Sequence, residues 1–389
     1  MEYYKIKDVY KRIKGTPITA GKMKEIATPD GSVRIFAGGK TVINANEKDI
    51  PNANITRVPA VLVQSRGVID AVYYDKPFTF KNEMWAYSTF NQKSVKYLYY
   101  ILKSNIQTFR DAASGMGALP QISLGVTEEF EIPVPPLPVQ EEIVRILDTF
   151  TELQAELQAE LQKRLQQYNF YRDNLLNFKD INRGRQEIKW MKMSDVCSIK
   201  GRIGFRGYTR NDQVKRGEGA LSLSPSNISN GKMDYSKGTY ITWTKYDESP
   251  EIQTFNGDII FCKTASIGKV AFVTNLPCKA TINPQLVVLK DIKCSARFLA
   301  YFLETNYIQN IVMSLAGIGS VPNISQKALS DILIPIPPLE EQNRIVSILD
   351  RFDTLTNDLT QGLPAEIEKR RQQYEFYRDK LLTFKRKEA

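Results

Sequence analysis

The chain has 389 residues, and 53 Lys plus Arg against 43 Asp plus Glu give it a formal net charge of +10. This length allows two or three domains, and 42% hydrophobic with 25% charged residues is typical of a folded chain. The sequence contains no histidine, which excludes imidazole general bases, Ser-His-Asp and Cys-His nucleophiles and histidine zinc sites. The excess positive charge favours an anionic partner, with nucleic acid as the first candidate.

The four cysteines are far apart and form no CxxC pair, so neither a thiolate zinc cage nor a dithiol redox motif is expected. We expect buried or unreactive thiols in a reducing compartment. The opening residues are polar, and no stretch approaches the roughly 20 apolar residues that span a bilayer. These features predict a cytoplasmic protein that has no contact with a membrane.

The elements alternate between two kinds along the chain. Residues 1–136 contain short β-rich runs such as VPAVLVQ, separated by Gly, Asn, Asp and Pro, which predicts an α+β domain. Residues 137–180 carry apolar side chains at alternating steps of three and four, which predicts one long amphipathic helix. A second α+β domain is predicted over 181–338 and a second long helix over 339–389, with a break where Gly362 precedes Pro364.

The chain is a tandem duplication. The segment IPVPPLPVQEEIVRILDTF at 132–150 recurs as IPIPPLEEQNRIVSILDRF at 334–352, which is 202 residues later. Upstream and downstream segments repeat in the same order. These are GMGALPQIS (115–123) with GIGSVPNIS (317–325), YLYYILKSN (97–105) with FLAYFLETN (298–306), and QQYNFYRDNLLNF (166–178) with QQYEFYRDKLLTF (372–384).

The repeat predicts the architecture. We expect two globular α+β target-recognition domains, separated by two long helices that form an antiparallel coiled coil with an internal pseudo-twofold axis. A protein of this symmetry suits a DNA duplex, and its unlike domains predict a bipartite, asymmetric target.

Candidate DNA-contacting residues come from loops of the two domains. Arginine forks suit guanine edges and phosphates, glycines permit close backbone approach, and small hydroxyls and turn amides can hold phosphate. The glycine-rich stretch at 200–216 and the turns at 64–72 and 261–270 supply most of them. The candidates are Arg34, Lys40, Arg57, Gln64, Ser65, Arg66, Arg202, Arg206, Tyr208, Arg210, Lys215, Arg216, Lys263, Thr264, Ser266 and Lys269.

Three catalytic motifs are incomplete. GGKT at 38–41 ends like a phosphate loop, but Arg34 occupies the position of its first glycine. Asn283-Pro284-Gln285 is similar to the Asn-Pro-Pro-aromatic tetrapeptide of DNA amino-methyltransferases but lacks the second proline and the aromatic residue. The Gly-Xaa-Gly turns at 115 and 317 lack the third glycine of a dinucleotide fingerprint.

The repeated IP(V/I)PPL…Q segments, the IV-x-IL-D-x-F helix starts and the QQY-x-FYRD-x-LL-x-F helix ends resemble those of specificity subunits of Type I restriction-modification enzymes. The resemblance implies a non-catalytic DNA-reading subunit that binds no cofactor itself. It implies two modification subunits that bind S-adenosylmethionine, docked on the helices, and restriction subunits that use ATP and magnesium. The implied docking residues are Pro136, Leu137, Gln140, Tyr168, Tyr171, Arg172, Pro338, Leu339, Gln342, Tyr374, Tyr377 and Arg378.

Two alternatives stay open from the sequence. One is a single-chain methyltransferase or nuclease with two recognition domains, which would need a cofactor or metal motif that the chain lacks. The other is a specificity subunit of a Type II-like system, or an orphan exchangeable copy without a restriction partner.

Overall fold

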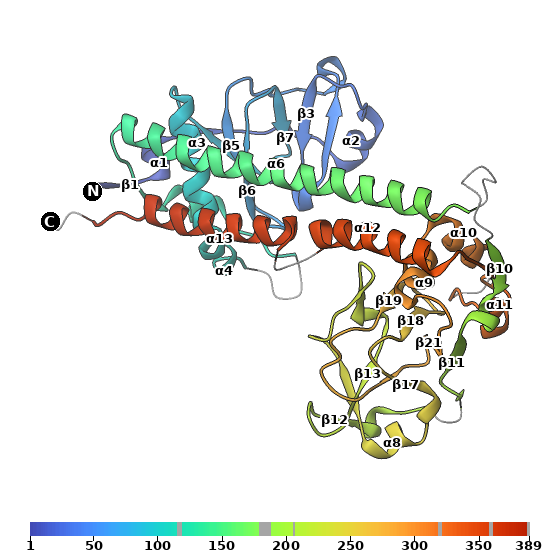
Figure 1. Ribbon diagram of the computed structural model, residues 1–389. Coiled ribbons are helices and arrows are strands. Elements are labelled where there is room, and N and C mark those ends of the chain that lie inside the picture. Colours follow the sequence, from blue (N-terminus) through green and yellow to red (C-terminus); the bar gives the residue numbers. More distant parts are fainter. Residues whose placement is uncertain (115–118, 179–187, 205–206, 318–320, 358–360, 387–389) are drawn as a thin grey trace. The chain divides into compact units, whose positions relative to one another are not determined.

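The chain folds into two compact units (Figure 1). Unit 1 comprises 1–157 and 367–389, and unit 2 comprises 158–366. Each unit therefore combines one β-rich domain with helical segments from both copies of the repeat, whereas the predicted domain boundaries follow chain order and stay predictions. The computed structural model describes residues 1–114, 119–178, 188–204, 207–317, 321–357 and 361–386.

Unit 1 is built on a four-stranded antiparallel sheet with strand order β2-β8-β5-β6. A second sheet has the order β4-β3-β7, in which β3 and β7 are parallel, and β1 pairs with β9. Its elements are β1 (Tyr3–Lys5), α1 (Ile6–Val9), β2 (Lys11–Ile13), α2 (Ala20–Ile26), β3 (Val33–Phe36), η1 (Gly38–Lys40), β4 (Val42–Ala45), η2 (Glu47–Asp49), β5 (Ala60–Gln64), β6 (Asp70–Tyr74), β7 (Phe78–Phe80), β8 (Trp85–Ser88), α3 (Gln92–Ser104), α4 (Ile106–Asp111), α5 (Leu124–Glu128) and β9 (Glu131–Pro133).

Unit 2 has a four-stranded antiparallel sheet of order β11-β21-β18-β19 and a five-stranded sheet of order β12-β16-β13-β20-β17. Its elements are β10 (Lys189–Lys192), α7 (Met193–Val196), β11 (Ser198–Gly201), η4 (Arg210–Asp212), β12 (Gln213–Val214), β13 (Ala220–Leu223), η5 (Pro225–Asn227), β14 (Ile228–Ser229), β15 (Lys232–Met233), β16 (Thr239–Ile241), α8 (Trp243–Asp247), η6 (Pro250–Ile252), β17 (Gln253–Thr254), β18 (Ile259–Cys262), β19 (Val270–Phe272), β20 (Ala280–Ile282), β21 (Leu286–Lys290), α9 (Ala296–Leu303), α10 (Asn306–Leu315), α11 (Gln326–Ser330) and β22 (Leu333–Ile336).

The two units share one sheet topology. The four-stranded sheets have the same order and directions, the parallel pair β13 and β20 corresponds to β3 and β7, and β10 with β22 corresponds to β1 with β9. In unit 1, an isolated bridge between Thr56 and Phe78 stands where unit 2 has the pair β17 and β20. The duplication seen in the helices therefore extends through the β-rich domains.

The central strands of each four-stranded sheet are buried on both faces. In β5, Val61 and Val63 pack with the helices, whereas Leu62 packs with Phe78 of the second sheet. Successive side chains of a strand point to opposite faces, so a strand covered on both sides is an unbroken apolar run. The same alternation occurs in β18, where Ile259 and Phe261 lie in one core and Ile260 and Cys262 lie in another.

The long helices are α6 (Leu137–Leu175), α12 (Leu339–Asn357) and α13 (Leu363–Leu382). In unit 1, Ile143 of α6 lies beside Leu381, and Phe150 stacks on Tyr377 with ring centroids 5.4 Å apart. The contacts advance along α6 as they recede along α13, so these helices are antiparallel.

Unit 2 repeats this helix contact. Tyr171 of α6 stacks on Phe352 of α12 with centroids 5.5 Å apart. Phe150 and Phe352 are equivalent in the repeat, as are Tyr171 and Tyr377, so each stacked pair takes one ring from each copy. The two units therefore repeat one helix contact with the two copies exchanged, which agrees with the internal repeat that the sequence predicted.

The predicted break in the second long helix is confirmed. Helix α12 ends at Asn357 and α13 begins at Leu363, with Gly362 outside both helices, whereas α6 is continuous (Figure 1). Pro364 occupies the second position of α13, where its missing N–H costs no helical hydrogen bond. Among the described residues, no helix is both long and apolar enough to cross a membrane.

Candidate nucleic-acid interface

Four loops meet at one end of the four-stranded sheet of unit 1, where β5 ends and β8 begins. The backbone N–H of Ile122 donates to Ser65 O at 2.9 Å, and that of Gly67 donates to Pro120 O at 2.8 Å. A Cβ placed on Gly67 would lie 3.6 Å from Gly39 Cα. The short helix η1 therefore lies against the turn that contains Gly67. We call residues 38–40, 64–67, 81–84 and 119–122 the loop edge of unit 1.

The same arrangement occurs in unit 2. The N–H of Ile324 donates to Lys263 O at 2.9 Å, and that of Ala265 donates to Pro322 O at 3.0 Å. Ala265 has φ 64°, and its counterpart Gly67 has φ 79°, so the turn keeps its left-handed residue even where the side chain is not glycine. We call residues 224–227, 263–268, 283–285 and 321–324 the loop edge of unit 2.

One backbone hydrogen bond fixes a further equivalence. The N–H of Lys81 donates to Phe36 O at 3.0 Å, and the N–H of Asn283 donates to Leu223 O at 2.8 Å. Both acceptors end the equivalent strands β3 and β13. Lys81 and Asn283 therefore occupy the same position of the scaffold.

Each of these residues pairs with the side chain two positions later. In unit 1, Lys81 Nζ lies 2.9 Å from Glu83 Oε1. In unit 2, Asn283 Nδ2 donates to Gln285 Oε1 at 3.1 Å, and Gln285 N donates to Asn283 Oδ1 at 3.0 Å. All four residues are partly exposed. Unit 1 thus presents an ion pair where unit 2 presents a neutral amide pair.

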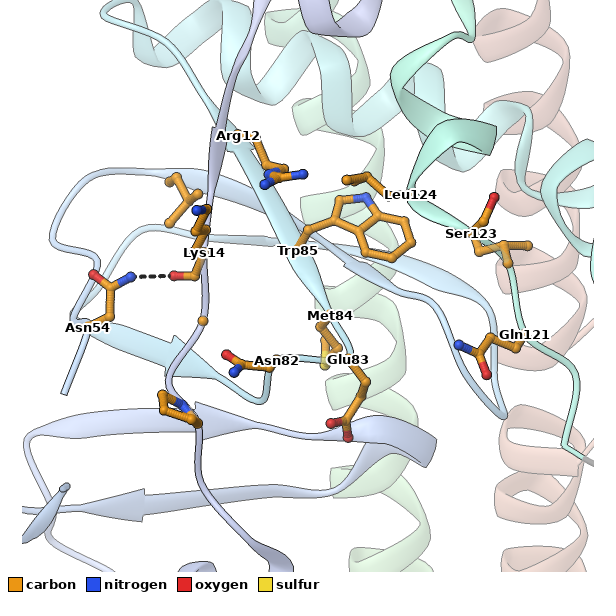
Figure 2. Close-up of a pocket in the computed structure, with 14 residues that line it drawn as sticks. Arg12, Lys14, Asn54, Asn82, Glu83, Met84, Trp85, Gln121, Ser123 and Leu124 are labelled. Carbon is orange, nitrogen blue, oxygen red and sulfur yellow. Dashed lines mark hydrogen bonds between the residues drawn. The ribbon is translucent and has the colours of Figure 1, made fainter. Parts of the chain in front are cut away.

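A hollow of about 640 Å³ opens beside the loop edge of unit 1 (Figure 2). Its wall includes Trp85, whose Nε1–H donates to Thr127 Oγ1 at 2.9 Å. Figure 2 shows the polar groups of Asn82, Glu83 and Gln121 around this hollow. Cations, amides and a carboxylate here are the side-chain types that contact base edges and phosphates.

The structure separates the candidates of unit 1. Arg66 is exposed at the loop edge, whereas Gln64 and Ser65 are buried, and the Ser65 hydroxyl donates to Glu83 O. Arg57 is exposed and pairs with Glu47 at 2.6 Å. Gln64 and Ser65 therefore support the loop edge from inside.

Two further candidates of unit 1 are Arg34 and Lys40. Arg34 is partly buried, and its Nε donates to Asn44 Oδ1 at 3.3 Å. The side chain of Lys40 lies outside the part of the chain that the structure describes.

Arg202 serves the fold of unit 2. Its side chain is buried, its Nε donates to Ile282 O at 3.0 Å, and a terminal nitrogen donates to Thr281 Oγ1 at 3.1 Å. The guanidinium lies over the Tyr208 ring, 5.3 Å from its centroid, and burial lowers the pKa of Arg202. We therefore remove Arg202 from the candidate interface. Tyr208 is partly buried, and its hydroxyl hydrogen-bonds Ser222 Oγ at 2.8 Å.

The other candidates of unit 2 lie in two segments, the surroundings of β12 and the turn after β18. The register of β12 places Lys215 and Arg216 at the end of the sheet where β13 terminates, and Arg210 at the opposite end. Lys263 and Thr264 belong to the loop edge, and the Thr264 hydroxyl donates to Asn323 Oδ1 at 2.8 Å. Ser266 and Lys269 are exposed in the same turn, and Arg206 lies outside the described residues.

Sequence reasoning missed residues that the fold brings to the loop edges. Their signal was present in two patterns. The repeat pair LPQIS and VPNIS differs at one internal polar position, and Asn283-Pro284-Gln285 places two carboxamides side by side in a segment that matches a methyltransferase motif only in part. The missed residues are Lys81, Asn82, Glu83, Gln121, Asn283, Gln285 and Asn323.

The predicted docking residues differ in exposure. Gln140 and Gln342 are buried, and their amides donate to Pro135 O and Pro337 O at 2.8 Å, so they support the helix starts. Tyr168 and Arg172 are buried, and Tyr374 and Arg378 are partly buried. The exposed ones are Pro136, Leu137, Tyr171, Pro338, Leu339 and Tyr377.

Two exposed aromatic residues were not predicted. Phe170 and Phe376 are equivalent in the repeat, and the two residues are 65% and 62% exposed. Each packs edge-on against the following tyrosine, with centroids 5.6 Å apart for Phe170 and Tyr171 and 5.4 Å apart for Phe376 and Tyr377. The QQY-x-FYRD repeat was the available signal. In the described part of the chain, no group of three or more Cys, Asp or Glu is placed to hold a metal ion.

Comparison with known proteins gives a consistent result. A family model described as Type I restriction modification DNA specificity domain matches residues 1–167 and 186–369. The Type I restriction enzyme EcoR124I/EcoR124II specificity subunit of Escherichia coli is 33% identical over 307 residues, covering 77% of this chain and 73% of that relative. The Type I restriction enzyme MpnII specificity subunit of Mycoplasma pneumoniae is 30% identical over 331 residues, covering 68% of this chain and 92% of that relative.

The fold is also known. A crystal structure of a Type-I restriction-modification system S subunit from M. genitalium aligns with a TM-score of 0.58 at 16% identity, covering 99% of this chain and 96% of that chain. Each matched range covers one β-rich domain and the first part of the long helical segment that follows it. The chain therefore belongs to the Type I restriction modification DNA specificity domain family, which confirms the family that the repeated helix segments indicated.

Proposed function

We propose that the chain is the non-catalytic, sequence-reading subunit of a type I restriction-modification complex. Each unit reads one half of a bipartite, asymmetric DNA target through its loop edge. The observation that carries this function is the pair of loop edges, in which one scaffold presents different polar side chains at equivalent positions. Two unlike readers on one chain require two unlike half-sites.

The exposed cations supply the contacts that hold the duplex. Arg66 in unit 1 and Lys263, Lys269, Lys215 and Arg216 in unit 2 are partly or fully exposed, and the net charge of +10 favours a polyanion. Phosphate contacts orient the protein, whereas side chains that reach base edges provide the sequence information.

The partners supply the chemistry. Two modification subunits bind S-adenosylmethionine and transfer the methyl group, and restriction subunits use ATP and magnesium. The duplicated aromatic pairs at Phe170 and Phe376 support this stoichiometry, because two copies of one exposed surface suit two copies of one partner. The exposed residues Leu137 and Leu339 extend the apolar surface at the two helix starts.

Methylome sequencing of cells that express the chain with its modification subunit tests the function. We expect one methylated motif with two short, unlike specified parts separated by unspecified base pairs. The purified chain without the modification subunit should show no binding of S-adenosylmethionine by calorimetry. A continuous or palindromic motif, or methyl transfer by the chain alone, would contradict the proposed function.

A further inference from the structure

The pairs Lys81–Glu83 and Asn283–Gln285 differ in a way that phosphate binding does not explain. They occupy one position of the scaffold in its two copies, anchored by the same backbone hydrogen bond. A lysine suits a phosphate, but the Glu83 carboxylate would repel it. A carboxylate on a DNA-facing loop edge instead has a use at a base edge, where the cytosine N4 amino group is a donor.

The chemistry of each pair matches one base pair in the major groove. Guanine presents the acceptors O6 and N7, which suit the Lys81 ammonium, and its partner cytosine presents the N4 donor, which suits Glu83. Adenine presents the N7 acceptor and the N6 donor side by side, which suit one carboxamide. Asn283 and Gln285 are both carboxamides. The two pairs are therefore complementary to different base pairs.

Contacts within each pair prepare it for binding. The Lys81 and Glu83 side chains are 2.9 Å apart and about three-quarters buried, so they lose little conformational freedom on docking. The Asn283 side-chain amide donates to Gln285 Oε1 at 3.1 Å and accepts from the backbone N–H of Gln285 at 3.0 Å. An ammonium has three donors and a carboxylate has several acceptor positions, so each partner keeps capacity for a base.

We propose that these pairs read the bases at equivalent positions of the two half-sites. Lys81 and Glu83 specify a G·C pair in one half-site, and Asn283 with Gln285 specifies an A·T pair in the other. The assignment rests on the proposed function and adds to it the base-reading residues and the class of base pair that each one recognises.

The test uses the full chain assembled with its modification subunit, after the wild-type target is known. Duplexes are selected by binding from a DNA library in which one half-site is randomised at a time. For the variant Lys81→Asn with Glu83→Gln, we expect one G·C position of the unit 1 half-site to become A·T, a preference change of about 5- to 100-fold. The other half-site and the spacing should not change.

The reciprocal variant provides an independent measurement in unit 2. Asn283→Lys with Gln285→Glu should convert one A·T position of the other half-site to G·C. The matched control is Lys22→Asn with Glu25→Gln, which removes an exposed ion pair of 2.7 Å from α2 in unit 1 and should leave the target unaltered.

Each outcome decides the assignment. Selected motifs that are unchanged in both variants, with thermal unfolding as in the wild type, would overturn it. A change at the same position in the control would also overturn it. If one double variant does not fold, the variant in the other unit decides. Failure of the wild-type complex to select any bipartite motif would instead refute the proposed function.

Discussion

In unit 1, the strand β7 ends at Phe80, whose carbonyl accepts from the backbone N–H of Thr16 at 2.7 Å, and the Thr16 hydroxyl hydrogen-bonds Thr79 Oγ1 at 2.7 Å. In unit 2, the equivalent acceptors are Ile282 O and Thr281 Oγ1, and both receive the Arg202 guanidinium. A neutral residue and a long cation thus satisfy the same two buried groups.

The comparison shows which parts of the duplicated chain are constrained. A buried acceptor must have a donor, but its identity is free when the surrounding chain differs. Gly15 of unit 1 has no room for a side chain, because a Cβ there would lie 2.1 Å from Phe80 O. Arg202 follows β11 at the position equivalent to Gly15. Its side chain donates to the two acceptors whose equivalents in unit 1 are contacted by Thr16. Clustered arginines in a glycine-rich loop therefore do not all face a ligand.

The largest expected effect comes from exchanging a whole recognition domain. Replacing residues 1–136 with the corresponding domain of another family member should change one half of the target and keep the other half and the spacing. The physical reason is that the loop edge of each unit is built from its own β-rich domain. Methylome sequencing measures the result, and a target altered in both halves would refute independent reading.

The helix surface is the part that the two copies share. Replacing Phe170 and Phe376 by Ala should weaken binding of the modification subunit by about 30-fold or more, as for exposed aromatic anchors of an interface. Titration calorimetry measures the affinity. Phe90→Ala, which removes an aromatic side chain that is fully exposed outside the helices, is the control. Equal affinity of the double variant and the control would exclude these residues from docking.

Arg202 tests the comparison of buried acceptors directly. Arg202→Ala leaves Ile282 O and Thr281 Oγ1 without this donor, so the free energy of unfolding should fall by about 1–3 kcal/mol. The target of the assembled complex should not change. Arg210→Ala, at an exposed position, should stay within about 0.5 kcal/mol of the wild type. A relaxed base position with unaltered denaturant midpoint would show that Arg202 reads DNA.

The turn after β18 should contribute to DNA binding through contacts between its lysines and phosphate groups. Replacing Lys263 and Lys269 by Ala should weaken binding and reduce the slope of log K against log salt by about 0.9 for each phosphate contact removed. Fluorescence anisotropy over a salt series measures the slope. The control replaces Lys24 and Lys48, two exposed lysines of unit 1 that lie outside its loop edge. An unchanged slope in the Lys263 and Lys269 variant would remove this turn from the interface.

A smaller difference concerns the ends of the equivalent helices α3 and α9. Lys103 of unit 1 pairs with Asp70 at 2.6 Å. Its counterpart in the repeat is Glu304, which is partly buried and packed closely enough that a Cβ on Gly231 would lie 2.6 Å from its carboxylate. Burial raises the pKa of Glu304 to about 7.

This shift predicts a pH dependence of stability. Arg172 and Arg297 favour the charged carboxylate and Asp353 opposes it, but burial has the largest effect on the pKa of Glu304. The folded state holds this proton more tightly than the unfolded chain, whose pKa is near 4.5, so stability falls as pH rises from about 4.5 to about 7. Glu304→Gln should remove this component. Melting temperatures between pH 5 and 8 measure it, and an identical pH profile for the variant would contradict it.

The sequence predicted much of this architecture because segments that repeat in the sequence adopt the same structure in both copies. The IPVPPL and QQY-x-FYRD segments identified the duplication, the long helices and the family, and Gly362 with Pro364 predicted the break between α12 and α13. The candidate site was predicted less well. Arg66 and Lys263 do lie on loop edges. Composition could not distinguish an exposed arginine from the buried Arg202, because exposed and buried arginines both occur in glycine-containing loops.

What the sequence determined by itself was everything local or repeated: the element types, the two copies and the unlike character of their loops. Only the tertiary structure decided which loops meet. Residues 38–40, 64–67, 81–84 and 119–122 are separated along the chain, and strand pairing and backbone hydrogen bonds bring them to one end of a sheet. The equivalence of Lys81 with Asn283 likewise depends on a hydrogen bond to the end of a neighbouring strand, which no local pattern encodes.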